Sequence, residues 1–203
     1  KEKIEDRQQK KDQLNFDEFK LETEIRTMYH LSPYPNYPKN IKGIGQFLMS
    51  YIIAEENKEL IFFDQKMLFE KLLYELYILE LQKKKVNTVN VNNPILIELL
   101  PLESEILTKF LEDLIIAGFS ISHFGKNTFS LYSIPEILPV DKAENVINGL
   151  ISCFGMLKNE NDKKKISKDI SYTIATNLGL NSMIELNLFE IDFLLAKWEL
   201  LGS

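Results

Sequence analysis

Cysteine and histidine are scarce in this chain of 203 residues. The single cysteine, Cys153, excludes an intramolecular disulfide framework and a cysteine-rich zinc site. The two histidines, His30 and His123, are too few for a multi-histidine metal centre. Eight Gly and seven Pro exclude collagen-like and Gly/Pro-rich low-complexity classes. The chain is therefore expected to fold around an ordinary apolar core.

Long apolar runs are also missing from the sequence. None reaches the roughly 18–20 residues that a membrane-spanning helix needs, so no membrane partner is expected. Hydrophobic residues make up 45% of the chain and charged residues 27%, a balance typical of globular proteins. At this length we expect one domain or two small lobes.

Excess positive charge is absent too, because the net charge is −6. Binding to nucleic-acid phosphates needs a positive surface, which this chain can offer only as a local patch. Two lysine clusters, 83–85 and 163–165, could form such patches or could be solvated loops. Any contact with DNA is expected to be weak and sensitive to salt.

The first 42 residues differ in composition from the rest. Residues 1–20 are rich in charge and Gln, and three prolines between positions 33 and 38 disfavour helix in the residues before them. We interpret residues 1–42 as a linker or arm from a longer parent chain, with one short helix near residues 17–29.

Short apolar runs and polar turns then alternate. Residues 47–54 and 60–63 are predicted strands, joined by a hairpin turn at residues 55–58. Asp64 can cap a helix to about Leu81, whose apolar residues recur every three or four positions. A polar connection and a further strand are expected next, at 83–93 and 95–100.

A second helix–hairpin unit follows. A helix from Leu102 should end at Gly118, a residue suited to a left-handed cap. The other expected elements are two strands and three helices, at 119–124, 128–134, 143–157, 166–178 and 183–201. The last helix is apolar on more than one side, so it must be covered on more than one side, and a partner chain is a natural cover.

Several segments, in this order, resemble the C-terminal domain of the MutL family of DNA mismatch repair proteins. Residues 45–55 and 60–75 are similar to the family's second strand, its Asp-Gln exit and the Glu-rich helix that follows. Residues 118–135 resemble a family run with the pattern GF-x-x-x-x-FG-x-x-x-F…IP. The similarity spans residues 44–138 and continues more weakly to residue 201.

The resemblance implies a mixed α/β (α+β) fold with two lobes. Residues 43–82 and 163–203 would form a dimerisation lobe with a small sheet and helices. Residues 83–162 would form an inserted outer lobe with a helix and a β-hairpin. The family's ATP-binding module lies far N-terminal, and no glycine-rich phosphate-binding motif occurs here, so no cofactor is expected in this domain.

Many MutL proteins carry a metal-dependent endonuclease with the signature D-Q-H-A-x-x-E-x-x-x-x-E. Lys66 stands where the signature has His, and a protonated lysine has no lone pair to donate to a metal. Residues 174–177 offer no thiolate or imidazole where the family has a downstream Cys element. The matching positions are Asp64, Gln65, Glu70 and Glu75, which could equally be a helix cap, a polar neighbour and two exposed glutamates. We therefore expect neither a catalytic nor a metal site.

The segment 93–98 resembles the family's sliding-clamp motif, Q-x-[LI]-[LI]-x-P. Asn93 replaces Gln and Glu98 replaces Pro, while Ile95 and Leu96 keep the apolar anchors. The segment is either a clamp contact or a simple buried strand.

The hypothesis that follows is a non-enzymatic homodimerisation domain of a mismatch repair scaffold, which holds two ATPase modules together and recruits repair partners. In a bacterium such a protein would be cytoplasmic and nucleoid-associated. Two alternatives stay open: an endonuclease with a degenerate site (Asp64, Glu70, Glu75), and an unrelated α/β protein-interaction domain. The expected interface residues are apolar: Phe47, Tyr51, Ile53, Phe62, Phe189, Phe193 and Trp198.

Overall fold

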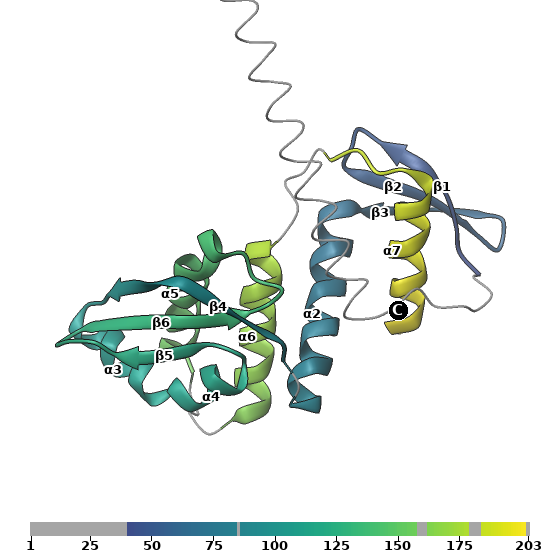
Figure 1. Cartoon of the computed structure of the whole chain (residues 1–203). Helices are drawn as coiled ribbons and strands as arrows, with labels where there is room; N and C mark the ends of the chain where they lie inside the picture. The colour runs from purple at the N-terminus through teal and green to yellow at the C-terminus, as the bar shows by residue number, and fades with distance from the viewer. Residues whose placement is uncertain (1–39, 85, 158–161, 179–183, 202–203) are drawn as a thin grey trace, which may run out of the picture. The chain divides into compact units, whose positions relative to one another are not determined.

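The computed structural model describes residues 40–84, 86–157, 162–178 and 184–201 (Figure 1). They form two compact units. The described parts of 40–72 and 184–201 make the first unit, and those of 73–178 make the second. Each unit has its own three-stranded sheet, so the fold is mixed α+β, which confirms the predicted class. The expected arm and its short helix lie outside the described residues.

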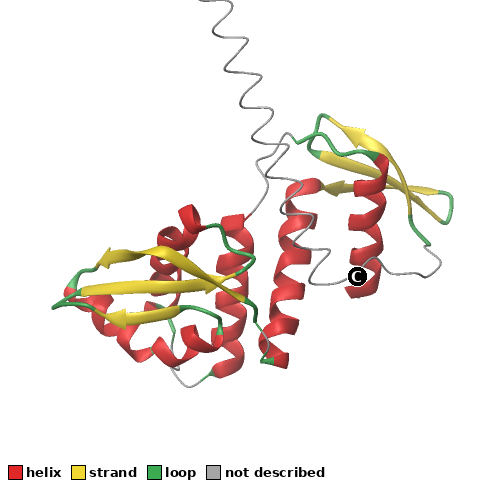
Figure 2. Cartoon of the chain, in the orientation of Figure 1, coloured by secondary structure: helices red, strands yellow, loops and turns green. Residues whose placement is uncertain are grey.

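The first unit is built on an antiparallel sheet in the order β1-β2-β3, formed by Lys42–Phe47, Tyr51–Glu56 and Glu59–Asp64 (Figure 2). Side chains alternate between two faces, as strand geometry requires. Ile52 and Ala54 on the inner face are fully buried. The predicted hairpin between β2 and β3 is present, and the predicted 47–54 run contains a turn that ends β1.

The inner face of this sheet packs against α7 (Leu188–Leu201), which begins five residues later than the sequence predicts. Gly43 allows a close approach, because a Cβ atom there would lie 2.7 Å from Ile191 Cγ2. The Gly43 amide donates to Asp192 Oδ1 at 3.1 Å, and the Asn40 amide donates to Glu199 Oε1 at 2.9 Å. Segments about 150 residues apart in sequence thus complete one small core.

Helix α2 (Gln65–Lys83) begins directly after β3. Asp64 caps it as predicted, since its Oδ1 accepts the Met67 amide at 2.9 Å. The helix continues into the second unit, where the buried Tyr77 hydroxyl donates to the Ala117 carbonyl at 2.6 Å. This bond ties α2 to the end of α4.

The second unit has an antiparallel sheet in the order β4-β6-β5, formed by Thr88–Glu98, Thr128–Pro135 and Ser120–His123. The predicted helix from Leu102 is present but breaks at Phe110 into two pieces. Gly118 follows with φ of 87°, the left-handed conformation expected of it. The helical elements of this unit are α3 (Pro101–Lys109), α4 (Leu111–Ile116), the short η1 (Val140–Lys142), α5 (Ala143–Gly155) and α6 (Lys163–Leu178).

Helix α6 packs on α5 and groups with the second unit. The resemblance assigns residues 163–178 to the dimerisation lobe instead. The difference has a physical reason: the buried side of α6 carries Ile166, Ile170 and Ile174, which need the apolar face of α5 as cover. None of the described helices combines the length and the apolarity that crossing a bilayer requires.

Candidate functional site

The outer face of the β1-β2-β3 sheet carries large apolar side chains in contact with solvent. Phe47 pairs with Tyr51 and Ile53 pairs with Phe62 across the strands. Phe47, Tyr51 and Phe62 are exposed, and Ile53 is half-buried between them. Leu60, opposite Glu55, adds a fifth apolar side chain that the predicted interface does not include. Such a contiguous apolar face is typical of a protein–protein contact.

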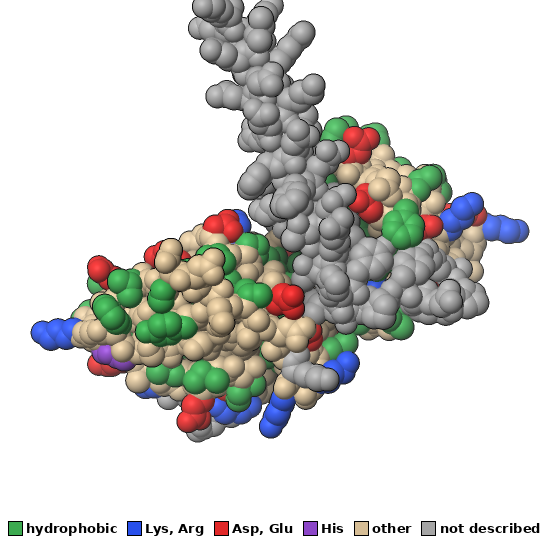
Figure 3. Space-filling model, viewed as in Figure 1, with side chains coloured by type: hydrophobic (Ala, Val, Ile, Leu, Met, Phe, Trp, Pro, Cys, Tyr) green, Lys and Arg blue, Asp and Glu red, His purple; other side chains and the backbone are tan. Residues whose placement is uncertain are grey.

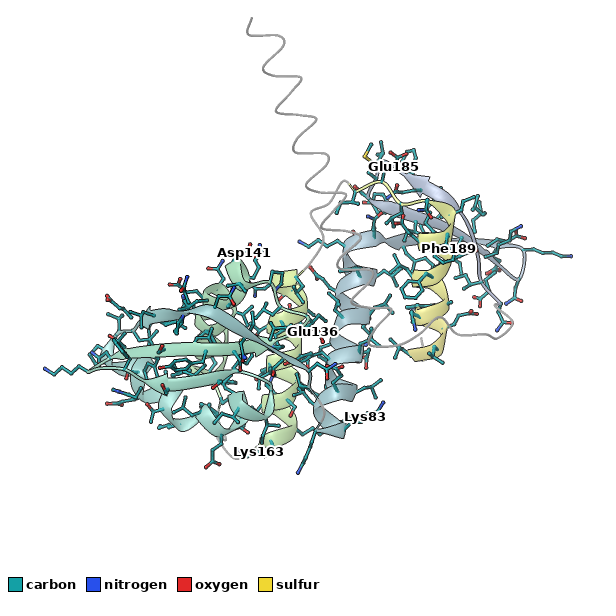
Figure 4. All side chains as sticks on the ribbon, viewed as in Figure 1. Lys83, Glu136, Asp141, Lys163, Glu185 and Phe189 are labelled. Atoms are coloured by element: carbon teal, nitrogen blue, oxygen red, sulfur yellow. The ribbon has the colours of Figure 1, made fainter. Side chains whose placement is uncertain are left out.

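The three interface residues predicted on α7 differ in how far their side chains are buried. Phe189 lies near the start of the helix and is exposed (Figure 4). Trp198 is half-buried and packs edge-on against Phe63, with ring centroids 5.0 Å apart. Phe193 is fully buried in the single chain. Phe193 therefore offers no surface to a second copy, which corrects its place in the predicted interface, and Trp198 contributes mainly to the core.

Two glutamine side chains connect the sheet to the segment before α7. The Gln46 Nε2 group donates to Gln65 Oε1 and to the Ile184 carbonyl, the latter at 2.7 Å. Gln65 Nε2 donates to the same carbonyl at 3.1 Å, and Gln46 Oε1 accepts the Leu186 amide at 3.1 Å. Gln65 is buried, so this cluster explains the glutamine of the Asp-Gln pair as a structural residue. Gln46 was missed as a partner because its contacts with Ile184 and Leu186 are about 140 residues away in sequence.

The remaining positions of the endonuclease signature surround the start of α2. Lys66 Nζ lies 3.8 Å from Glu70 Oε1, one helical turn away, so the lysine occupies the neighbourhood of that carboxylate. Partial burial raises the pKa of Glu70 above its ordinary value, the Lys66 ammonium lowers it, and the nearby Asp64 carboxylate raises it further. The arrangement is that of an ion pair at a helix start.

The donors present do not fit a metal site of the kind that the resemblance implies. Glu75 is five positions beyond Glu70 and so projects from a different side of α2. Among the residues that the structure describes, no group of three His, Cys, Asp or Glu side chains gathers where a metal ion could bind. The two signature carboxylates that lie near each other are thus Asp64 and Glu70, with the Lys66 ammonium beside them.

Comparison with known families decides which class of protein carries this surface. Residues 44–185 match the family model described as the MutL C terminal dimerisation domain. The chain belongs to the MutL C-terminal dimerisation domain family. This confirms the predicted resemblance.

Three curated relatives are DNA mismatch repair proteins MutL. Those from Clostridium botulinum strain Loch Maree / Type A3 and strain 657 / Type Ba4 are each 30% identical, over 75% and 87% of this chain. The protein from Koribacter versatilis strain Ellin345 is 24% identical over 78% of it. The matched region is 22%, 26% and 24% of these three proteins. The chain thus spans about a quarter of the length of the MutL proteins it matches.

The candidate clamp segment of this MutL domain lies on β4. The Leu96 side chain is 51% exposed and Asn93 is exposed, whereas Ile95 is half-buried and Ile97 is buried. The space-filling view shows hydrophobic side chains gathered on the visible face of the second unit, over its sheet (Figure 3). Leu96 is therefore accessible to a partner, whereas in a simple buried strand its side chain would be covered.

Proposed function

We propose that this MutL C-terminal domain forms a homodimer through the outer face of the β1-β2-β3 sheet. The observation that carries the proposal is the exposure of Phe47, Tyr51 and Phe62 on one sheet face in a member of a dimerisation family. Burying such side chains removes apolar area from water, worth about 25 cal/mol per Å². Phe189, at the start of α7, is a further exposed apolar side chain of the same unit.

The proposed role in the parent protein is mechanical. Dimerisation of this domain would hold two tethered ATPase modules at high effective concentration, so that their closure becomes intramolecular. Repair partners would be recruited to this scaffold. With a net charge of −6, the domain itself would contribute little to DNA affinity, and that contribution would fall steeply with added salt.

Sedimentation of the Phe62→Glu variant tests the proposed interface. A carboxylate at this position would be buried without a partner in the dimer, so the dissociation constant should rise at least a hundredfold. Phe124→Glu is the matched control, because Phe124 is 65% exposed against 62% for Phe62 but belongs to the second unit. If Phe62→Glu and Phe124→Glu both self-associate with the dissociation constant of the parent chain, this sheet face is excluded as the interface.

We further propose that the exposed Leu96 edge of β4 contacts a sliding clamp. Leu96→Glu should abolish binding of a purified bacterial clamp in surface plasmon resonance, because the apolar anchor would be lost. Val89→Glu, at a less exposed position of the same strand, is the control and should bind as before. If the Leu96→Glu variant still binds the clamp, the proposed contact is wrong and β4 has only a structural role.

The endonuclease alternative rests on the signature carboxylates Asp64 and Glu70 at the start of α2, where partial burial first and the Asp64 charge last raise the Glu70 pKa. We propose instead that the Lys66 ammonium takes the place of a bound cation beside these carboxylates, and that strand cleavage is supplied by another protein.

A further inference from the structure

The turn between β1 and β2 has an unusual backbone for its residue types. The Ser50 amide donates to the Phe47 carbonyl at 3.2 Å, which closes a tight turn around Leu48 and Met49. Leu48 has φ of 51° and Met49 has φ of 50°. Turns with two successive positive φ values favour Asn, Asp and Gly, because bulky side chains are strained in this conformation.

The other hairpin of the same sheet provides an internal comparison. Asn57 and Lys58, between β2 and β3, also have positive φ values, 53° and 68°. Asn tolerates this conformation through its short polar side chain, and both residues are suited to water. The two turns lie at opposite ends of an antiparallel meander (Figure 2). One sheet therefore places polar residues at one end and large apolar residues at the other, on similar backbones.

Folding of the single chain does not account for Leu48 and Met49. Leu48 and Met49 are 70% and 47% exposed, so a large part of their apolar area stays in water in the protomer. Their backbone conformation disfavours them as well. Strained backbone is concentrated at functional sites in proteins, so this pair is suited to a contact outside the described part of the protomer.

Surrounding residues indicate what that contact is. Phe47 and Tyr51, which flank the turn, belong to the exposed apolar face, and Met67 is exposed three residues after Asp64, the cross-strand neighbour of Tyr51. The opposite end of the sheet carries charged residues instead: Glu55, Glu56, Lys58 and Glu59. Burial against a second copy would remove apolar area from water at the apolar end, whereas the same burial at the mainly acidic end would take carboxylates out of water.

We propose that the apolar tip formed by Phe47, Leu48 and Met49 packs against a second copy of this chain and lies in the buried core of the dimer interface. The charged β2–β3 turn lies at its rim or outside it. This inference rests on the proposed homodimer and adds which end of the sheet is central to it.

Replacing the strained pair by the residues that its backbone favours tests the inference. The Leu48→Asn/Met49→Gly double variant should keep or raise the thermal midpoint of the monomer, since strain is relieved. Its dimer dissociation constant, measured by sedimentation across concentrations, should rise at least tenfold. Lys58→Gly is the matched control, because it relieves the same strain at the other turn and should leave the dissociation constant unchanged.

The outcomes separate this inference from the proposed function. A double variant that associates as tightly as the parent chain overturns the role of the tip, while dissociation by Phe62→Glu would still support the sheet face. A parent chain that is monomeric at high micromolar concentration overturns both.

A second measurement applies if the double variant does not fold. In a Cys153→Ser background, a polarity-sensitive fluorophore on Met49→Cys should shift to the blue as concentration rises, and one on Lys58→Cys should not. Equal behaviour of the two labels overturns the inference.

Discussion

Lys197 is a charged residue within the apolar part of α7. Its side chain is fully buried and its Nζ lies 5.3 Å from the centroid of the Phe193 ring. Burial lowers the Lys197 pKa from 10.5 to about 8, because removal from water disfavours the ammonium form. Below about pH 8 Lys197 is protonated in the folded chain, and burial of its ammonium group lowers the free energy of unfolding. Between about pH 8 and 10.5 the unfolded chain binds a proton that the folded chain has lost, so this residue makes stability rise with pH.

Substitution by a neutral side chain of similar length should remove this cost. At about 1.4 kcal/mol for each pKa unit, Lys197→Met should raise the free energy of unfolding at pH 7 by up to about 3 kcal/mol. The gain should shrink between pH 8 and 10.5, as measured by denaturant titration at each pH. Lys168→Met, on α6, is the control. A gain that stays constant over this range would contradict the assignment to desolvation.

At the scale of the element, β1 is shaped by its contact with α7. A methyl group on Gly43 would lie 2.7 Å from Ile191 Cγ2 and 3.1 Å from Asp192 Oδ1. Gly45 lies in the same strand, and among the described residues no atom comes within 4 Å of a Cβ built there. The two glycines therefore differ in what surrounds them.

Alanine at these two positions should have opposite effects. Gly43→Ala forces β1 away from α7, and overpacking of this kind costs about 1–3 kcal/mol of unfolding free energy. Gly45→Ala should be neutral or slightly stabilising, because it reduces the freedom of the unfolded chain. Urea denaturation of both variants measures the difference. Equal midpoints would show that α7 does not pack closely on β1 in solution.

Sequence reasoning succeeded where local chemistry determines structure. The Asp64 cap and the left-handed Gly118 depend on their own few residues, so both could be predicted. The β1–β2 turn could not, because Leu48 and Met49 belong to an apolar run that is typical of a strand interior. The burial of Phe193 and the Gln46–Gln65 contacts depend on packing between distant segments, which periodicity in one helix cannot reveal.

At the scale of the whole molecule, the described residues form two units with separate sheets, and the first unit carries the exposed apolar face that we propose for self-association. The signature positions Asp64, Lys66 and Glu70 lie in the unit that carries this face, at the start of α2, whereas Glu75 belongs to the second unit. Lys66 faces Glu70 at 3.8 Å there and cannot act as a metal ligand while protonated.

The chain should therefore not cleave DNA. Incubation with supercoiled plasmid and manganese should give no nicked product above a buffer control, at concentrations where sedimentation shows the dimer. A MutL protein with the complete D-Q-H-A signature serves as the positive control. Robust nicking that Asp64→Asn abolishes would establish the endonuclease alternative.

The hydrogen bonds from Gly43 to Asp192 and from Asn40 to Glu199 join the two sequence segments of the first unit. The whole second unit lies between these two segments in the sequence. During synthesis on the ribosome, residues 40–178 are translated before residues 184–201, and most of the second unit can emerge and begin to fold first. Until the later segment emerges, the inner face with Ile52 and Ala54 lacks the cover that α7 provides. A nonsense codon between residues 178 and 184 would give a truncated chain in which the second unit can fold but the inner face of the first sheet stays exposed. We expect proteases to degrade this product, and we do not expect it to form a dimer.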